Sequence, residues 1–288
     1  MAAEIPCAAC SWTPERQNGC RYNSHVKLFY GVSDRGVWSI GSDVIVKERS
    51  DAPPNFEAQN IRFLQAKTTI PVPDIIHEST EADGAYIMIM KRVPGVTLKK
   101  AWPNLSEVDK DRIAQQTAEY LTQLRKIQSD RLQSLDDQPV YSAWLFQNGY
   151  GVPHGPLESD DQLWEEMAKG LQGVPDKARR RLRDRMPPAK PYTFTHGDLT
   201  NENVIVKDGN LSGIIDWEAS GYFPVWWEFA ATGIGHGSED WDWKVLLRKH
   251  MDKHDKALEF WRDYYALSSY PNLGDRGTKL LRELECDD

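Results

Sequence analysis

The polar residues best suited to chemistry lie in the run THGDLTNENVIVKDGNLSGIIDWE, from Thr195 to Glu218. Asp198 stands in a polar loop, Asn203 follows five residues later, and Asp216 comes after two apolar stretches. Carboxylate and amide oxygens are hard ligands of the kind that Mg²⁺ prefers. Phosphoryl transfer uses such a metal to neutralise phosphate charge, and a carboxylate to accept the proton of the attacking hydroxyl. The types and spacing of these residues therefore predict a phosphoryl-transfer site.

A β-hairpin is expected to bring these side chains to one place. The strand-like runs NVIVK and LSGIID flank the sequence DGN at 208–210, which is a strong turn signal. With a loop of two or three residues, Asn203 lies opposite Ile214 or Ile215, close before Asp216. The polar loop that precedes the hairpin then meets Asp216 at the open end.

The positions of these residues in the run suggest their roles. Asp198 suits the catalytic base, and His196, beside it in the catalytic loop (residues 196–202), is the second candidate catalytic residue. Asn203 and Asp216 suit the metal. The alternative is that these side chains only satisfy the backbone of turns, as Asp and Asn often do. The spacing H-x-D-x-x-x-x-N, combined with an aspartate after the hairpin, favours the catalytic interpretation.

A lysine–glutamate pair is expected upstream of this run. Glu57, Ile61 and Leu64 are spaced so that a helix places them on one face. Because Ile61 and Leu64 should face inward, Glu57 should also point into the protein, where its carboxylate needs a cation. Lys47, at the end of the preceding strand-like run, is the nearest candidate, and a lysine held in this way could bind nucleotide phosphates.

The elements that must position these residues fall into two groups. Up to about residue 93, β-branched and alternating runs separated by turn residues predict an antiparallel sheet. One helix, beginning near Pro54, interrupts this sheet, and Pro94 with Gly95 ends it. The predicted strands are 26–32, 36–40, 43–48, one that follows the run at 70–76, and 85–93.

The rest of the chain has mainly helical patterns. Ser106 and Asp109 resemble a helix cap, and an apolar helical period continues from there to about Ser129. A loop region follows at 138–160, then helices at 162–186, the strand pair at 192–216, and helices again from 226 to the C-terminus. The predicted fold class is α+β, with a small antiparallel sheet lobe that contains one inserted helix and a larger, mainly helical lobe.

Composition restricts the partners. The 288 residues are 27% charged and carry a formal net charge of −8, which disfavours a nucleic-acid partner because phosphate backbones require a basic surface. The densest basic segment, Lys177 to Arg185, is interpreted as a solvated helix face. The longest strongly apolar run, Ala85 to Met90, is too short to span a bilayer.

The N-terminal segment has no signal-peptide pattern, so we expect a cytoplasmic protein. Its thiols fit a reducing compartment. Cys7, Cys10, Cys20 and His25 allow a zinc site to be drawn, but the spacing is irregular, and packed or free thiols are favoured.

Two motifs resemble a known family. HGDLTNEN at 196–203 and IIDWE at 214–218 are similar to motifs of the aminoglycoside phosphotransferase and choline-kinase-like family, a branch of the protein-kinase-like fold. The runs around Lys47 and Glu57 support this resemblance, which extends over roughly 26–229. Both motifs are highly specific.

The resemblance implies a two-lobed, protein-kinase-like fold. An N-terminal extension at 1–25 would precede a nucleotide-binding lobe at 26–93, and the second lobe, at 94–288, would hold the catalytic loop, the metal site and the acceptor pocket. ATP with Mg²⁺ is the implied cofactor set, with GTP left open. The adenine would lie near the connection between the lobes, which contains the residues Met90, Arg92 and Val93.

The chain departs from kinase patterns at two places. A G-x-G-x-x-G run over the phosphates is missing, and DRGVWSIGS supplies only Gly36 and Gly41. Phosphate binding would then depend on a shorter loop, on Lys47 and on the metal. Asp216 is followed by Trp-Glu rather than the Phe-Gly of protein kinases, which argues against a protein substrate.

The acceptor is expected to be a small molecule with a hydroxyl group. Aromatic and acidic residues of the C-terminal region, among them Trp227, Glu228 and Asp240, could hold a cationic acceptor. The alternatives are that the tryptophans are core residues and that Glu228 supports the catalytic loop. A kinase-fold protein with lost or altered chemistry, acting as a nucleotide or small-molecule binding module, is the alternative function.

Overall fold

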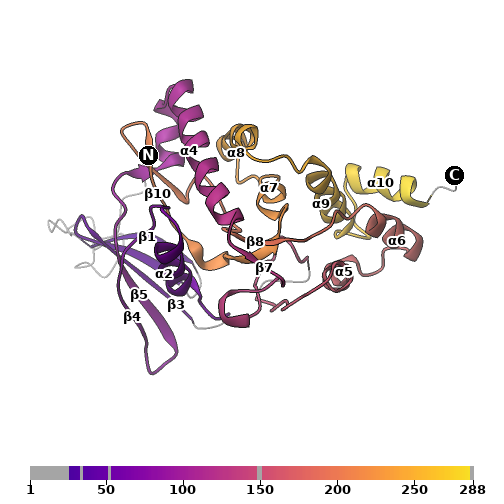
Figure 1. Cartoon of the computed structure of the whole chain (residues 1–288), viewed down its shortest axis with the longest axis horizontal. Helices are drawn as coiled ribbons and strands as arrows, with labels where there is room; N and C mark the ends of the chain where they lie inside the picture. The colour runs from indigo at the N-terminus through magenta and orange to yellow at the C-terminus, as the bar shows by residue number, and fades with distance from the viewer. Residues whose placement is uncertain (1–25, 33–34, 51–52, 148–150, 286–288) are drawn as a thin grey trace, which may run out of the picture.

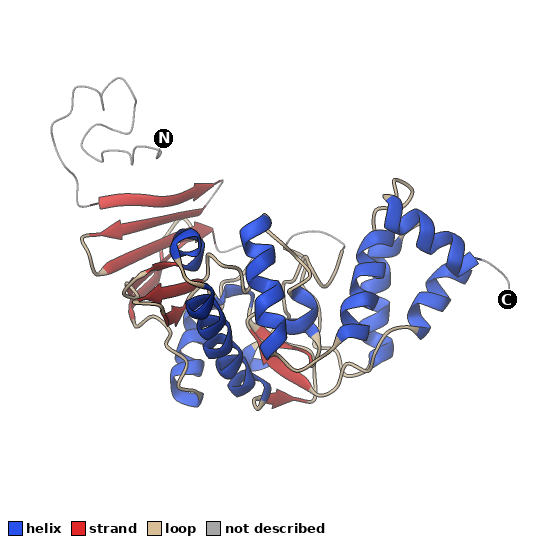
Figure 2. Cartoon of the chain, turned by 90° about the horizontal axis from the view of Figure 1, so that it is seen from above, coloured by secondary structure: helices blue, strands red, loops and turns tan. Residues whose placement is uncertain are grey.

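A computed structural model describes residues 26–32, 35–50, 53–147 and 151–285 of the protein. The largest sheet lies at the N-terminal end, and the rest of the molecule is mainly helical with a few short strands (Figure 1). Seen from above, the sheet and the helices of the C-terminal end lie at opposite ends of the molecule (Figure 2). The predicted α+β class, with a small sheet lobe and a larger helical lobe, is confirmed.

The N-terminal lobe is one antiparallel sheet with the strand order β1-β2-β3-β5-β4. Its strands lie close to the predicted runs because alternating β-branched residues favour a sheet with one face covered. The strands are β1 Val26–Val32, β2 Arg35–Ile40, β3 Val44–Ser50, β4 Ile75–Thr80 and β5 Ala85–Lys91.

Helix α2, Glu57–Lys67, connects β3 to β4 and covers the sheet. Glu57, Ile61 and Leu64 are buried, as their spacing predicted. The helix begins at Glu57 rather than near Pro54, and the side-chain oxygen of Asn55 accepts a hydrogen bond of 2.8 Å from the Glu57 amide. This start places the Glu57 carboxylate at the first turn of the helix.

The predicted hairpin consists of β9 Val204–Lys207 and β10 Asn210–Ile214. Asp208 and Gly209 form its two-residue turn with φ values of 51° and 71°, as a type I′ turn requires. The short strand β6, Val96–Thr97, adds to β9, so the chain that leaves the N-terminal lobe is hydrogen-bonded to the hairpin.

A second small sheet was not predicted in full. Strand β8, Tyr192–Thr195, pairs with β7, Gln128–Ser129, and with β11, Gly221–Pro224. No strand was expected at 221–224 from the sequence, so β11 and its pairing with β8 were missed. The ring of Tyr222 packs edge-on against Phe194, 5.4 Å away between centroids, a contact between strands that are far apart in the sequence.

Helices form most of the second lobe. Ser106 caps the long helix by accepting a hydrogen bond from the Asp109 amide, as predicted. The helices are α3 Leu98–Ala101, η2 Trp102–Asn104, α4 Glu107–Arg125, η3 Leu135–Asp137, α5 Asp160–Ala168, η4 Lys169–Leu171, α6 Asp176–Asp184, η5 Trp217–Ala219, α7 Trp227–Ala231, α8 Ser238–His250, α9 Asp255–Leu267 and α10 Asp275–Glu285.

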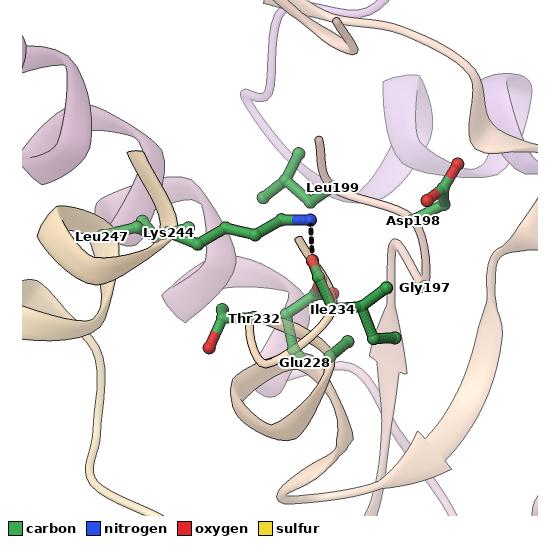
Figure 3. A pocket seen from close by; sticks show the side chains of 9 residues that line it. Gly197, Asp198, Leu199, Glu228, Thr232, Ile234, Lys244 and Leu247 are labelled. Atoms are coloured by element: carbon green, nitrogen blue, oxygen red, sulfur yellow. Dashed lines mark hydrogen bonds between the residues drawn. The ribbon is translucent and has the colours of Figure 1, made fainter. Parts of the chain in front are cut away.

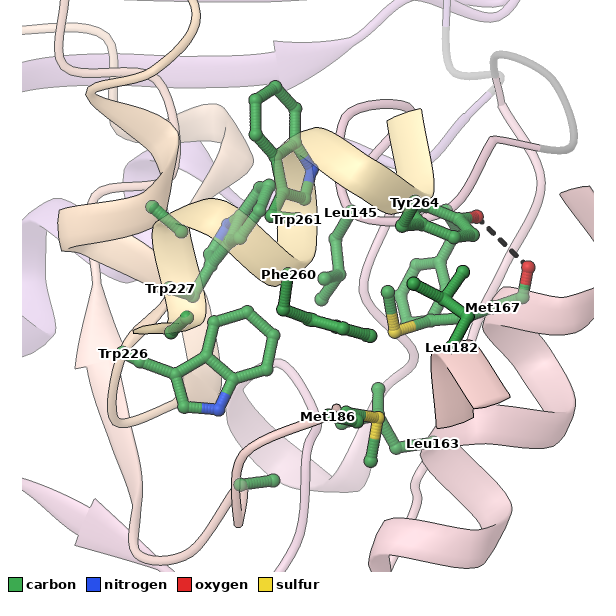
Figure 4. Packing of buried hydrophobic residues seen from close by; sticks show 14 of the residues in the cluster. Leu145, Leu163, Met167, Leu182, Met186, Trp226, Trp227, Phe260, Trp261 and Tyr264 are labelled. Atoms are coloured by element: carbon green, nitrogen blue, oxygen red, sulfur yellow. Dashed lines mark hydrogen bonds between the residues drawn. The ribbon is translucent and has the colours of Figure 1, made fainter. Parts of the chain in front are cut away.

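Two large hydrophobic clusters hold this lobe together. One packs α5, α6, α7, α9 and α10, and its tryptophans Trp226, Trp227 and Trp261 surround Phe260 (Figure 4). The other joins α2, α4, the hairpin and α8. Because the hairpin contributes to this second cluster, the end that carries the candidate site is anchored in a core. Within the described residues, no helix is long and apolar enough to cross a membrane.

Candidate active site

Lys47 connects the two lobes through a three-residue ion cluster. Its ammonium on β3 donates to both carboxylate oxygens of Glu57, at 2.7 and 2.9 Å, and to Asp216 at 2.8 Å. The register pairs Lys47 with Met88 and leaves the lysine on the face that α2 covers. The predicted pair of Lys47 and Glu57 is therefore present, and Asp216 joins it from the other lobe.

Burial and charge set the protonation of this cluster. Burial alone would lower the pKa of Lys47, but the carboxylates of Asp216 and Glu57 raise it above the usual value. Burial would raise the pKa of Asp216, but the ammonium of Lys47 holds it below the usual range. The pKa of Glu57 is raised, chiefly by burial. The lysine is thus a fixed cation at the boundary between the lobes.

Asp216 has a backbone conformation that few residues adopt. Its φ of 67° and ψ of 60° lie in the left-handed region. Two hydrogen bonds from side chains hold this turn. The Trp217 indole donates to the Ile214 carbonyl at 2.9 Å, and the side-chain amide of Asn60 donates to the Trp217 carbonyl at 2.8 Å. These contacts aim the carboxylate of Asp216 at Lys47 despite the strain.

The imidazole of His196 joins the catalytic loop to the hairpin. Its Nε2 donates to the Ile215 carbonyl at 3.0 Å, and its Nδ1 accepts from the Asp198 amide at 3.2 Å. These two bonds define a neutral ring with its proton on Nε2. Burial lowers the pKa of His196 to about 4. Since both ring nitrogens bind backbone, the contacts of His196 match positioning of the loop rather than proton transfer.

Glu228 is hydrogen-bonded to the backbone of the same loop. Its carboxylate, on α7, accepts a hydrogen bond of 2.7 Å from the His196 amide and another from the Gly197 amide. Burial raises the pKa of Glu228 to about 7, against the effect of these two amides. Of the two roles expected from the sequence, the contacts match support of the loop rather than contact with an acceptor.

Asp240 is also a support. It is 1% exposed and accepts hydrogen bonds from the amides of Asn201 and His236, at 2.8 and 3.0 Å. Lys244, one turn later on α8, lies 2.8 Å from its carboxylate. With both oxygens engaged and its side chain buried, the contacts of Asp240 match support of the catalytic loop rather than contact with an acceptor.

Trp227 lies in the core. Its side chain is fully buried and packs against Phe223, Trp226 and Trp261. Core tryptophans were the alternative to an acceptor role, and the burial of Trp227 matches that alternative. The exposed Trp241 already faces two guanidinium groups of the chain, those of Arg248 and Arg262, at 5.3 and 5.8 Å.

Asp198 lies at the edge of a small cavity of about 10 Å³, which has room for about one water molecule. The aliphatic stem of Lys244 crosses this cavity, and its ammonium binds the Ile234 carbonyl at 2.5 Å (Figure 3). Burial, and then the charge of Asp216, raise the pKa of Asp198 to about 7. The carboxyl group therefore exchanges its proton near neutrality.

Asn203 and Asp216 offer oxygen atoms to a cation at the open end of the hairpin. The Ile215 amide donates to the Asn203 carbonyl at 3.0 Å, so Asn203 lies opposite the residue before Asp216, as predicted. The Asn203 side-chain nitrogen donates to the Asp198 carbonyl at 2.8 Å, which leaves its side-chain oxygen for a ligand. One amide oxygen and one carboxylate fit Mg²⁺, which binds few protein ligands and keeps several waters.

Other metal sites find no support in the described residues, where no group of three or more His, Cys, Asp or Glu side chains is suited to hold a metal ion. The zinc interpretation of Cys7, Cys10, Cys20 and His25 lies outside the described residues.

The connection between the lobes contains the expected nucleotide-binding residues. Met90 is 3% exposed and lies opposite Ile45 in the register, on the same sheet face as Lys47. The Arg92 amide donates to the Asp43 carbonyl at 2.7 Å. Val93 lies against Gly213, where an added Cβ would meet its side chain at 2.7 Å. The connection thus passes beside the hairpin.

Three charged residues that join the two lobes were missed by the sequence analysis. Glu218 accepts from Arg35 at 2.7 Å and also pairs with Arg49. A signal was present for one of them, because Arg49 follows Lys47 by two residues and so shares its strand face. Arg35 and Glu218 are 183 positions apart, and nothing in the sequence indicated their contact.

Comparisons of the sequence and of the structure with known proteins agree on one family. The sequence profile of the phosphotransferase enzyme family matches residues 31–263. An aminoglycoside 3'-phosphotransferase of Enterococcus faecalis is 29% identical over 180 residues, which make up 60% of this chain and 62% of that relative. The chain therefore aligns with less than two thirds of that relative's length.

Solved structures of the same kind share the fold. The ternary complex of APH(2'')-IIa with streptomycin and ATP has a TM-score of 0.55 at 17% identity and covers 94% of both chains. The GDP complex of wild-type aminoglycoside 2'-phosphotransferase-IIIa has a TM-score of 0.55 at 16% identity, covering 93% of this chain and 94% of the other. The two-lobed, kinase-like fold expected from the motifs is confirmed.

Proposed function

The chain belongs to the phosphotransferase enzyme family, and from this we propose that it is a kinase that transfers the γ-phosphate of ATP or GTP to a hydroxyl group of a small molecule. One observation carries the proposal. Lys47 lies between Glu57 and Asp216 at the open end of the hairpin, beside the loop that holds Asp198. A cation, a metal-binding carboxylate and a carboxyl group that titrates near neutrality are the parts that phosphoryl transfer requires.

Each residue has a role in this proposal. Lys47 binds phosphate oxygens of the nucleotide and is held in place by Glu57. Asn203 and Asp216 hold Mg²⁺, which when bound neutralises charge on the phosphates. Asp198 accepts the proton of the acceptor hydroxyl. Its pKa of about 7 suits this task, because a general base works best when its pKa lies near the operating pH.

The nucleotide binds between the lobes in this proposal. Met90, Arg92 and Val93 border the adenine from the connection, which is where the family resemblance expects them. Both ATP and GTP remain candidates, since the structural neighbours include an ATP complex and a GDP complex. A direct competition experiment between ATP and GTP will show which nucleotide this chain prefers.

For the acceptor we propose a cationic alcohol of the aminoglycoside type. The support is the name of the Enterococcus faecalis relative and the streptomycin of one structural neighbour. The net charge of −8 favours the encounter with a cation. Because the fold hosts many acceptors, the substrate must be tested directly.

The proposal is tested with the full chain in two steps. Thermal shift with ATP, GTP and Mg²⁺ should raise the melting temperature, since a ligand that binds the folded state stabilises it. A coupled assay of ADP or GDP release, over aminoglycosides, choline analogues and sugars, should then identify an acceptor whose product gains the mass of one phosphoryl group. Stabilisation by nucleotide without turnover of any acceptor would favour the binding-module alternative. No stabilisation by either nucleotide would exclude the kinase.

A further inference from the structure

We propose that Arg35 is a phosphate-binding residue that exchanges Glu218 for the nucleotide, in place of the missing Gly-rich loop. Arg35 opens β2 at the β1–β2 connection, and its Nη1 lies 2.7 Å from Glu218 Oε1. Glu218 stands two residues after Asp216, so this contact joins the first residue of β2 to the turn that carries Asp216. The inference rests on the proposed function, because it assumes a nucleotide in the cleft.

Glu218 has a second, more permanent partner. The other carboxylate oxygen of Glu218 accepts from Arg49, whose side chain is 8% exposed. Arg49 also donates to the carbonyls of Pro53 and Ser50, at 2.8 and 3.3 Å. These contacts anchor Arg49 in the N-terminal lobe. Arg49 and Glu218 form the fixed part of the cluster.

Arg35 forms the exchangeable part. Its side chain is 27% exposed, as is that of Glu218, so a ligand bound between the lobes can reach both. When Arg35 leaves, Glu218 keeps Arg49 as its cation. No charge is then left buried and unpaired, which is the main cost of breaking an ion pair inside a protein. The exchange is thus possible without loss of the contact between the lobes.

The position of Arg35 fits the phosphates. The sheet register pairs Arg35 with Arg49, and Arg49 lies two residues after Lys47 on the same strand. Arg35 is therefore a diagonal neighbour of Lys47 on the same face, about 7–8 Å away along the sheet.

A guanidinium group suits this task. Its planar donors bind phosphate oxygens in pairs, and it stays charged at every relevant pH. In kinases a Gly-rich loop covers the phosphates with backbone amides. This chain has only Gly36 and Gly41 in that region, and its first strand connection carries Arg35 instead. The Arg35 guanidinium would thus bind phosphate oxygens that backbone amides of a Gly-rich loop bind in other kinases.

The test measures binding rather than activity. Calorimetric titration of the full chain with ATP, ADP and adenosine separates phosphate contacts from base contacts. Arg35→Gln should lower the affinity for ATP and ADP by about tenfold or more, as expected for the loss of a charge-assisted hydrogen bond. The affinity for adenosine should change by less than about twofold. Arg35→Lys keeps the charge but loses the paired donors, so it should fall between Arg35→Gln and the wild type.

Arg62→Gln is the matched control, because Arg62 also belongs to the N-terminal lobe and to an exposed ion pair, with Glu78 on β4. It should bind all three ligands as the wild type does. The melting temperature without ligand checks that each variant folds. If Arg35→Gln lost equal affinity for ATP and adenosine, or lost no affinity at all, the role of Arg35 would be overturned while the proposed function would stand. A wild-type chain that binds neither ATP nor ADP would overturn the proposed function as well.

Discussion

At the residue scale, Asp198 carries the proposed proton transfer. Asp198→Asn keeps the shape of the side chain but removes the group that accepts the proton. We expect kcat to fall roughly 10²- to 10⁴-fold, the usual contribution of a general base, while the affinity for ATP is retained. Steady-state kinetics on the identified acceptor, with calorimetry for ATP, measures both quantities.

The matched control for this variant is Asp252→Asn, since Asp252 is an exposed aspartate whose carboxylate pairs with Arg125 at the surface. It should leave both parameters unchanged. Turnover in Asp198→Asn near that of the wild type would show that another group accepts the proton.

Lys47 has a structural role that can be separated from its role in binding. Lys47→Met removes the cation from Glu57, a carboxylate that is 1% exposed. We expect a loss of about 3 kcal/mol in the free energy of unfolding, because a buried charge is left without a partner. The double variant Lys47→Met/Glu57→Leu removes that charge as well.

The double variant should recover most of the lost stability and none of the lost ATP affinity. Chemical denaturation measures the first quantity and calorimetry the second. If the double variant were as unstable as Lys47→Met, the buried carboxylate would not be the cause of the loss.

At the scale of elements, the catalytic loop is shaped by one glycine. Gly197 has a φ of 86°, and an added Cβ would lie 2.7 Å from the Ala219 carbonyl oxygen. Gly197→Ala should therefore destabilise the protein by about 1–3 kcal/mol and lower kcat more than the affinity for ATP, because the loop that carries Asp198 is displaced. Thermal denaturation and steady-state kinetics test this.

Gly274→Ala is the control for this change, because nothing lies within 4 Å of an added Cβ there. It should behave as the wild type in both measurements. A stable and fully active Gly197→Ala would mean that the loop tolerates a different backbone conformation.

Local signals predicted the elements better than long-range pairing. The hairpin was predicted from its turn residues, and the start of α4 from Ser106 and Asp109, because these signals act over a few residues. Strand β11 was missed because its pairing with β8 depends on residues about thirty positions away. The roles of Asp240 and Glu228 were uncertain for the same reason, since a buried carboxylate looks like an exposed one in sequence.

At the scale of the whole molecule, a buried histidine should make stability depend on pH. His154 is 2% exposed, stacks on Phe146 at 3.9 Å between ring centroids, and lies 3.0 Å from Glu166. Burial lowers the pKa of His154; Glu166 opposes this change, and the nearby Lys169 supports it. Below about pH 6.5 the unfolded chain therefore binds the proton more readily than the folded one, so stability is lost as the pH falls through that value.

His154→Gln removes this contribution, so its free energy of unfolding should fall less than that of the wild type between pH 7.5 and pH 5.5. Urea denaturation at both values measures the difference. His77→Gln, at an exposed position of β4, is the matched control and should keep the wild-type dependence. An equal fall in His154→Gln and the wild type would contradict the assignment.

The overall arrangement of the two lobes could be predicted, whereas the contacts between them could not. The lobes follow from patterns that repeat every two or every three to four residues. The contacts of Glu218 with Arg35 and Arg49 join positions that are 183 and 169 residues apart. The pair of Lys47 and Glu57, which lies within the N-terminal lobe, could be inferred because those residues are ten positions apart and one of them lies on an apolar helix face.

The attachment of the hairpin to the connection between the lobes has a mechanical consequence. Strand β6 pairs with β9, the Ile214 amide donates to the Pro71 carbonyl at 2.9 Å, and Ser212 donates to the Pro94 carbonyl at 2.6 Å. The hairpin therefore lies at the pivot about which one lobe would rotate against the other. Asn203 and Asp216 both belong to the second lobe, so such a rotation would leave their spacing unchanged and would move Lys47, on β3, toward or away from them.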